Sequence, residues 1–204
     1  MSAIHTHPVF TQERAKYVRM WDEVEDYRKT SPGEALVGPT LVLLGLRPGM
    51  RIVDVGCGVG RAGLKFSQLM LMVTLLDATP DALDEEVKAA VADDDAPIIF
   101  KEENVWGNWP TRLDGPQDLD YCCDVLEHIP TEFAMLVVQR CLEAAPRALL
   151  HISTEHDGFG LAIGDTLHLT VKPFTWWRDR LADVGWLLEA RDLLASGLFL
   201  LERA

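Results

Sequence analysis

The residues best suited to chemistry lie in one short stretch, RIVDVGCGVGRAGLKF (51–66). An apolar run carries Asp54, and glycines follow it at positions 56, 58, 60 and 63. Glycine permits a tight backbone turn and the close approach of a ligand, and a helix that starts after such a turn directs its first amides at an anion. The stretch predicts a ligand-binding turn between a strand and a helix. The alternative is a turn that needs glycine only for its backbone angles.

Two classes of cofactor suit such a turn. Residues 58–63 (GVGRAG) match the G-x-G-x-x-G pattern of dinucleotide-binding proteins. However, Asp54 at the end of the strand suits a cationic amine better than a pyrophosphate. The turn starts after residue 50 and about 140 residues follow it, which leaves little room for the separate substrate domain of a dehydrogenase. We therefore favour a cofactor that carries an amine over a nicotinamide dinucleotide.

Strands and helices alternate around this turn. Helical patterns are predicted at 11–30 and 34–46 before it, and at 61–70, 80–92, 131–145 and 175–185 after it, with Thr79 and Thr131 as caps. Strands are predicted at 51–55, 71–77, 98–100, 119–123, 147–153, 186–192 and 197–203. Alternation of this kind predicts a parallel sheet covered on both faces, and the two consecutive strands of the tail predict an antiparallel pair at one edge.

The pattern D-x-G-x-G-x-G at 54–60 resembles motif I of class I S-adenosylmethionine (SAM) methyltransferases, and the resemblance extends over about residues 48–202. It implies an α/β fold: a Rossmann-like, doubly wound, mostly parallel seven-stranded sheet with an antiparallel C-terminal edge strand and N-terminal lid helices. It also implies SAM as the cofactor and S-adenosylhomocysteine (SAH) as its product, bound in part by Asp54, Gly56, Gly58 and Gly60. We divide the chain into a helical lid segment, 1–46, and a SAM-binding methyltransferase domain, 47–204.

The same resemblance assigns cofactor contacts farther along the chain. Asp77 ends the second predicted strand and would accept hydrogen bonds from both ribose hydroxyls, with capping of the next helix as the alternative. Asn104 and the amide of Val105 would meet the adenine, and Trp106 would stack on it or belong to the core. Asp124 lies in CDVLEHIP (123–130), which is similar to the segment between methyl donor and acceptor in this family.

Tyr27 and Arg28 are assigned to the cofactor from the N-terminal side. In small methyltransferases of this kind an N-terminal helix often closes over SAM, so the guanidinium fork of Arg28 would bind the methionine carboxylate. The alternative is a surface arginine that pairs with Asp22 or Glu25.

His168 and His128 are the candidate catalytic residues. His128 follows the fourth predicted strand, where it would act as a general base or form a wall of the cofactor site. His168 lies in the long segment 154–174, where it would act as a base, contact the acceptor or pack as a loop histidine. No metal site is expected, because the H-x4-H spacing of 151–156 with Asp157 does not match one helix face.

The composition favours a small-molecule acceptor. The net charge of −13 argues against extended contact with nucleic acid. The chain also lacks the N/D-P-P-Y/F signature of amino-methylating DNA enzymes and the Pro-Cys nucleophile of cytosine-C5 enzymes. DYRKTSPGE (26–34), CDVLEHIP and LHLTVKPFTWW (167–177) resemble short phage and bacterial methyltransferases of unassigned acceptor, so a nucleotide or a sugar is also considered.

The remaining patterns concern location and rival functions. The stretch 1–10 lacks a signal-peptide pattern, the apolar run 69–76 is too short for a membrane span, and the four cysteines form no C-x-x-C pair. A cytoplasmic monomer or homodimer with no membrane partner is expected. The alternatives to a methyltransferase are a SAM-binding regulatory module without catalysis and an NAD-linked oxidoreductase.

Overall fold

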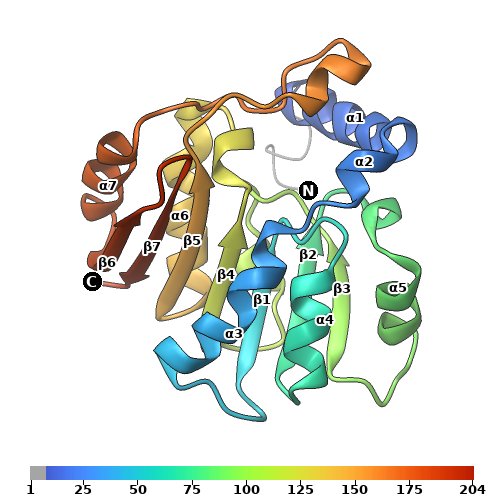
Figure 1. Ribbon diagram of the computed structural model, residues 1–204. Coiled ribbons are helices and arrows are strands. Elements are labelled where there is room, and N and C mark those ends of the chain that lie inside the picture. The colour runs from blue at the N-terminus through green and yellow to red at the C-terminus, as the bar shows by residue number, and fades with distance from the viewer. Residues whose placement is uncertain (1–7) are drawn as a thin grey trace.

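The computed structural model describes residues 8–204, and a seven-stranded sheet forms its centre (Figure 1). Residues 1–7, which include part of the expected lid segment and of the stretch inspected for a signal pattern, lie outside the described residues. The strands are β1 (Arg51–Val55), β2 (Met72–Asp77), β3 (Ile98–Glu102), β4 (Leu119–Cys123), β5 (Arg147–Ser153), β6 (Trp186–Asp192) and β7 (Ser196–Glu202).

The order of the strands is β3-β2-β1-β4-β5-β7-β6. The first five strands are parallel, whereas β7 runs antiparallel to both β5 and β6. The expected antiparallel pair therefore closes one edge of the sheet, with β7 on the inside and β6 outermost. Since the chain reverses its winding direction at β1, the carboxyl ends of β1 and β4 form a switch point, where open α/β sheets bind ligands.

Helices cover both faces of the sheet, as the alternation of elements predicts. One face carries α3 (Pro32–Leu44), α4 (Arg61–Gln68) and α5 (Glu85–Val91), and the other carries α6 (Thr131–Ala144) and α7 (Phe174–Ala182) (Figure 1). Short 3-10 turns lie at η2 (Pro80–Ala82), η3 (Trp109–Arg112), η4 (Leu126–His128) and η5 (Phe159–Ile163). None of the helices in residues 8–204 combines the length and apolar character that a membrane-spanning segment requires.

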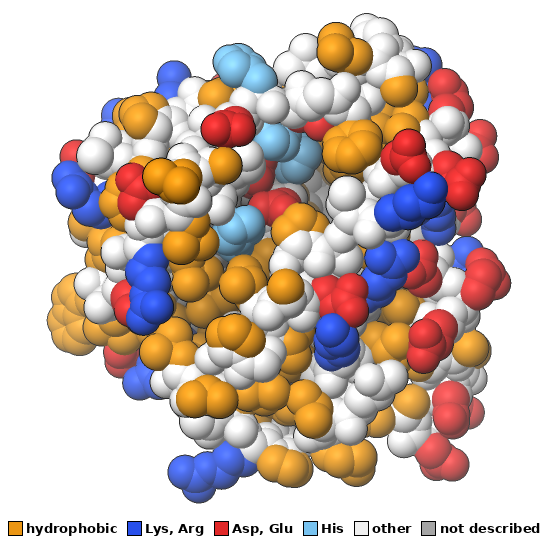
Figure 2. All heavy atoms as spheres, viewed as in Figure 1, with side chains coloured by type: hydrophobic (Ala, Val, Ile, Leu, Met, Phe, Trp, Pro, Cys, Tyr) orange, Lys and Arg blue, Asp and Glu red, His pale blue; other side chains and the backbone are white. Residues whose placement is uncertain are grey.

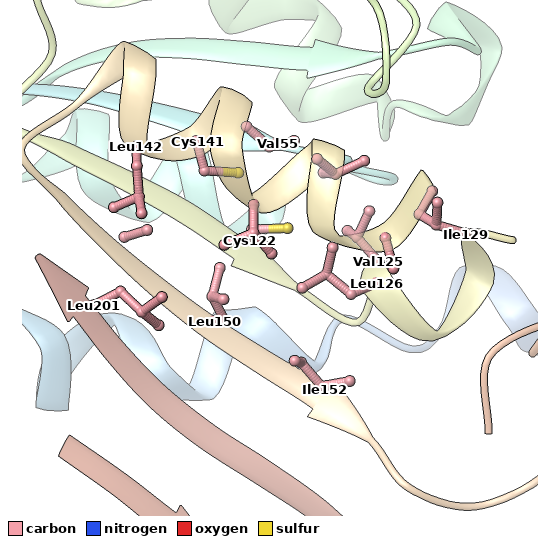
Figure 3. Packing of buried hydrophobic residues seen from close by; sticks show 14 of the residues in the cluster. Val55, Cys122, Val125, Leu126, Ile129, Cys141, Leu142, Leu150, Ile152 and Leu201 are labelled. Carbon is pink, nitrogen blue, oxygen red and sulfur yellow. The ribbon is translucent and has the colours of Figure 1, made fainter. Parts of the chain in front are cut away.

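Side chains alternate between two hydrophobic cores along each central strand. In β1, Val53 and Val55 pack under α6, while Ile52 packs under α4 on the opposite face. In β5, Leu150 belongs to the α6 core and Leu149 to the α4 core. Figure 3 shows the α6 core, where the side chains of α6 interdigitate with those of β4 and β5. Burial on both faces fixes the register of the sheet, and with it the positions of the loops at its carboxyl edge.

The N-terminal helices α1 (Pro8–Glu23) and α2 (Glu25–Arg28) do not cover a face of the sheet. They lie at its carboxyl edge, where α1 contacts η2 and η5 (Figure 1). The chain after β5 extends along the same edge and reaches α1. Two segments that are far apart in the sequence therefore meet above the ends of β1 and β4.

One predicted helix is wrong in its extent. The pattern at 80–92 predicts a single helix capped by Thr79, but the structure has the turn η2, an extended Leu83 with ψ of 137°, and α5 from Glu85. The Thr79 hydroxyl donates to Asp77 Oδ1 (2.8 Å) instead of capping a helix. Leu83 is buried in the α4 core, and this packing outweighs the helical pattern.

Candidate functional site

A cavity of about 430 Å³ opens at the carboxyl ends of β1, β2 and β4, beneath α1 and the segment 154–168. Figure 2 shows this part of the surface hollowed, with histidine and acidic side chains gathered at the hollow. Among the sequence-predicted site residues, the cavity is lined by Asp54, Gly56, Gly58, Asp77, Asn104, Val105, Trp106, Asp124, Tyr27, His128 and His168. Gly60 and Arg28 are not part of the lining.

The glycine turn forms the floor of the cavity. Gly58 has φ of +51°, in the left-handed region that favours glycine, and a Cβ atom there would reach the indole of Trp21 at 3.4 Å. Gly60 also has positive φ, but it faces the protein interior, where a Cβ atom would lie 2.7 Å from Val87 Cγ1. Gly58 therefore borders the ligand space, while Gly60 lets the turn pack against α5.

A buried carboxylate, Asp54, and a half-buried one, Asp77, flank this turn. Asp77 Oδ2 accepts from the Gly58 amide (3.0 Å), and Asp77 Oδ1 accepts from the amide (3.0 Å) and the hydroxyl of Thr79. Burial raises the pKa of Asp77, although these hydrogen bonds oppose the shift. Burial also raises the pKa of Asp54 to about 7, and the charge of Asp77 adds to this effect. The cavity thus offers two carboxylates whose ionisation a bound cation would favour.

The segment after β3 supplies an amide and an indole. Asn104 is 1% exposed, its Oδ1 accepts from the Trp106 amide (3.1 Å), and its Nδ2 has no hydrogen-bond partner in the described part of the chain. Trp106 is 4% exposed and stacks on Phe133 with ring centroids 5.6 Å apart. Trp106 therefore serves the core as well as the cavity wall, and Asn104 is left with an unused donor.

Arg28 does not reach the cavity. Its guanidinium donates to the carbonyls of Trp21 and Ala82, the latter at 2.9 Å, and lies over the Trp21 ring. Among residues 8–204, Arg28 forms no pair with Asp22 or Glu25, and the expected contact with the methionine carboxylate of SAM stays a prediction. Arg28 instead joins α1 to η2, and Tyr27 contacts the Trp21 ring with centroids 4.6 Å apart.

The predicted histidines meet at the opposite end of the cavity. The rings of His128 and His168 contact each other with centroids 4.7 Å apart. His128 Nδ1 lies 2.6 Å from the Tyr17 hydroxyl and 3.3 Å from the carbonyl of Leu167, while His168 Nδ1 lies 2.6 Å from the carbonyl of Glu155. Burial, and then the neighbouring His168, lower the pKa of His128 to about 3. His128 is therefore neutral at physiological pH.

Glu127 and Tyr17 are functional candidates that the sequence analysis missed. Glu127 is fully buried, and its Oε1 accepts from the Ser153 amide (2.7 Å). Burial, and then the Asp124 carboxylate, raise the pKa of Glu127 well above its ordinary value. Glu127 could have been found from its position next to His128 in CDVLEHIP. Tyr17 could not, because its contact with His128 depends on where α1 packs.

Asp124 is held in place by a short hydrogen-bonded chain. It has φ of +53°, which is uncommon for a residue with a side chain. Its Oδ1 lies 2.7 Å from His151 Nδ1, and His151 Nε2 lies 2.9 Å from the Ser196 hydroxyl. His151 is thus engaged with Asp124 and Ser196, and no contact joins it to His156, the other histidine of the H-x4-H spacing, among residues 8–204.

Comparison with known proteins agrees with this geometry. No protein-family model matches the chain. A magnesium-protoporphyrin O-methyltransferase from Synechocystis sp. is 31% identical over 117 residues, which cover 54% of this chain and 46% of that protein. The aligned region thus spans about half the length of this curated relative.

Solved structures extend the comparison to the whole sheet. The SAM-bound magnesium protoporphyrin IX methyltransferase of Synechocystis has a TM-score of 0.63 at 22% identity, over 87% of this chain and 80% of that one. The Burkholderia thailandensis 1,6-didemethyltoxoflavin-N1-methyltransferase, solved with 1,6-didemethyltoxoflavin and SAH, has a TM-score of 0.71 at 17% identity, over 100% of this chain and 92% of that one. The strand order, the glycine turn after β1 and these similarities together show that this chain has the fold of the class I SAM-dependent methyltransferases.

Proposed function

We propose that the protein is a SAM-dependent methyltransferase that acts on a small-molecule acceptor. The observation that carries the proposal is the single cavity at the switch point, which joins the glycine turn and Asp77 at one end to His128 and His168 at the other. When bound, SAM supplies an electrophilic methyl group on its sulfonium, which passes to a nucleophilic atom of the acceptor. The residues of this chain hold the two reactants in line, and such alignment supplies much of the rate of a displacement.

The residues at the end of the cavity with the glycine turn fit the cofactor. Asp77 offers carboxylate oxygens beside the Gly58 amide, an arrangement that suits the ribose hydroxyls. The buried and unpartnered Nδ2 of Asn104 requires an acceptor, and a ring nitrogen of adenine would supply one. Asp54 is 4% exposed, and this burial raises the pKa of its carboxyl group to about 7, so the cationic amine of SAM would favour its ionised form.

The other end suits an acceptor with polar atoms. His128, His168, Tyr17 and Glu127 line it and offer both donors and acceptors of hydrogen bonds. Phe10 and Phe159 also line the cavity, so an acceptor with a flat apolar part would fit there. The two methyltransferases compared above act, by name, on a porphyrin and on a toxoflavin precursor, which supports a small molecule. A nucleotide or a sugar would also be compatible with the polar groups.

Two rival functions make different demands on the same cavity. A regulatory SAM-binding module needs no polar groups at the acceptor end, whereas this end carries an acid, two histidines and a tyrosine. An NAD-linked oxidoreductase with the Rossmann strand order has no antiparallel strand between its fifth and edge strands. The insertion of β7 between β5 and β6 therefore disfavours that rival.

The test is the loss of SAH affinity in Asp77→Ala, measured by isothermal titration. The change removes a charged acceptor, worth about 1.5–3 kcal/mol, or about a 10- to 100-fold loss of affinity. Asp94→Ala is the matched control, because Asp94 is exposed in the loop after α5. Thermal unfolding of both variants separates lost binding from lost folding. Equal SAH affinity in folded Asp77→Ala and in the control would contradict the proposal.

A further inference from the structure

Three side chains at the acceptor end come together from two distant segments. Glu127 and His128 end η4, and His168 lies in the chain before α7. One ligand atom from each of the three, a carboxylate oxygen or an imidazole nitrogen, lies within 4.8 Å of the others. All three side chains line the cavity, so a small ion could reach them from solvent.

The hydrogen bonds of the two imidazoles leave one nitrogen of each ring available. His168 Nδ1 lies 2.6 Å from the Glu155 carbonyl, and His128 Nδ1 lies 3.3 Å from the Leu167 carbonyl. Because a carbonyl only accepts hydrogen bonds, the Nδ1 atom of His168 carries a proton. His128 Nδ1 lies 2.6 Å from the Tyr17 hydroxyl as well, and a ring that donates from Nδ1 to this hydroxyl or to the carbonyl keeps its lone pair on Nε2. The Nε2 atoms of both rings have no hydrogen-bond partner among the described residues. A backbone carbonyl that orients an imidazole in this way is the usual partner of a metal-binding histidine.

Glu127 completes the set with an oxygen that has no partner. The side chain is 0% exposed, Oε1 accepts from the Ser153 amide, and Oε2 has no hydrogen-bond partner among the described residues. No lysine or arginine in residues 8–204 forms an ion pair with Glu127 or with its neighbour Asp124. Glu127 lies against the Asp124 carboxylate, so the pair requires a shared proton or a compensating charge, and a cation between Glu127 and the two histidines would supply that charge.

We propose that Glu127, His128 and His168 bind one divalent transition-metal ion. Two imidazole nitrogens and one carboxylate oxygen suit Zn²⁺, Fe²⁺ or Co²⁺, whereas Mg²⁺ and Ca²⁺ prefer oxygen ligands alone. Three protein ligands leave coordination positions open for water or for oxygen atoms of the acceptor. A hydroxyl bound to the ion would lose its proton more readily, so the acceptor class would be an oxygen nucleophile that binds a metal. Only this last consequence rests on the proposed function.

The experiment measures metal binding in the absence of SAM and of any acceptor. The untagged protein carries His5→Ala and His7→Ala, so that N-terminal histidines do not contribute, and it is dialysed against Co²⁺ and, separately, against Zn²⁺ and Mg²⁺. We expect one Co²⁺ or Zn²⁺ per chain, a visible absorption spectrum for the Co²⁺ form, and no stoichiometric Mg²⁺. His168→Ala and Glu127→Gln should each lower the Co²⁺ affinity by at least about tenfold.

His156→Ala is the matched control, because His156 lies in the same segment and is exposed. It should keep both the stoichiometry and the spectrum. His168 is only half-buried, so His168→Ala tests the site even if Glu127→Gln fails to fold. Absence of stoichiometric binding by the starting protein, or equal affinity in folded His168→Ala and His156→Ala, would overturn the proposal.

A parallel titration with SAH keeps this proposal apart from the proposed function. SAH binding without Co²⁺ or Zn²⁺ binding would overturn the metal site and leave the methyltransferase proposal standing. Co²⁺ or Zn²⁺ binding without SAH binding would support the metal site and contradict the methyltransferase proposal.

Discussion

Gly63 sets how closely α4 approaches β2, and its replacement tests that geometry. A Cβ atom at position 63 would lie 2.2 Å from Leu75 Cδ2 and 3.2 Å from Val73 Cγ1. Carbon atoms in contact are normally about 3.5–4.0 Å apart, so the first contact requires α4 or Leu75 to move by more than about 1 Å. Such overpacking lowers the free energy of unfolding by about 1–3 kcal/mol, while alanine in place of glycine in a helix raises it by about 1 kcal/mol.

The two effects separate in a double-mutant cycle with Leu75→Val, which removes the clashing Cδ2 atom. In the native background we expect Gly63→Ala to lower the free energy of unfolding by up to about 2 kcal/mol. In the Leu75→Val background the 2.2 Å clash is gone and the 3.2 Å contact with Val73 Cγ1 remains, so Gly63→Ala should stabilise the protein by less than about 1 kcal/mol. The predicted coupling between the two sites is therefore about 1–3 kcal/mol.

Urea unfolding followed by circular dichroism gives the four free energies of the cycle. SAH titration adds a functional readout, because α4 begins directly after Gly60, at the end of the glycine turn. We expect Gly63→Ala to weaken SAH binding in the native background, and Leu75→Val to restore part of the affinity. A coupling energy near zero would refute the close approach of α4 to β2.

Three further predictions concern single residues. Since the pKa of Asp54 is raised to about 7, and a bound ammonium group favours the ionised carboxylate, SAM affinity should increase about fivefold from pH 6 to pH 7 and level off near pH 8, where an α-amine itself loses its proton. A pH profile of the same slope in Asp54→Asn, measured by titration calorimetry, would contradict this. His168→Ala should bind SAH within about twofold of the native protein, because a residue at the acceptor end makes no contact worth more than a few tenths of a kcal/mol with the cofactor; a large loss would place His168 at the cofactor end. Burial raises the pKa of Asp120 well above its ordinary value, so its ionisation opposes folding, and stability should fall as the pH rises above about 4. In Asp120→Asn this part of the pH dependence should disappear from urea unfolding curves, and an unchanged slope would show that Asp120 does not cause it.

The parts of the fold that follow from local pattern were predicted well. The strands β1, β4 and β5 begin and end at the predicted residues, because each is a short apolar run that ends in turn residues or acids. The positions of the glycine turn and of Asp77 could also be predicted from local pattern, because the turn directly follows β1 and Asp77 is the last residue of β2. The helix predicted at 80–92 is wrong because tertiary contacts of Leu83 and Asp77 override the local helical pattern.

The parts of the site that depend on long-range packing were not predicted. Tyr17 reaches His128 only because α1 crosses the carboxyl edge of the sheet, and no local pattern fixes that position. Glu127 meets His168 because its carbonyl accepts the amides of Leu169 and Thr170, which ties the later segment to η4. Arg28 directly follows Tyr27, which lines the cavity, but the guanidinium of Arg28 donates a hydrogen bond to the carbonyl of Ala82 in η2 and does not line the cavity.

The most direct test of the central claim is parallel isothermal titration of the purified protein with SAM, SAH and NADH. The cavity with Asp54, Asp77 and Asn104 predicts micromolar binding of SAM and SAH and no binding of NADH. Binding of NADH without SAM would contradict the assignment and make Asp77 a ligand of a nicotinamide dinucleotide ribose. Absence of binding by all three to the folded protein would leave the glycine turn with a structural role alone.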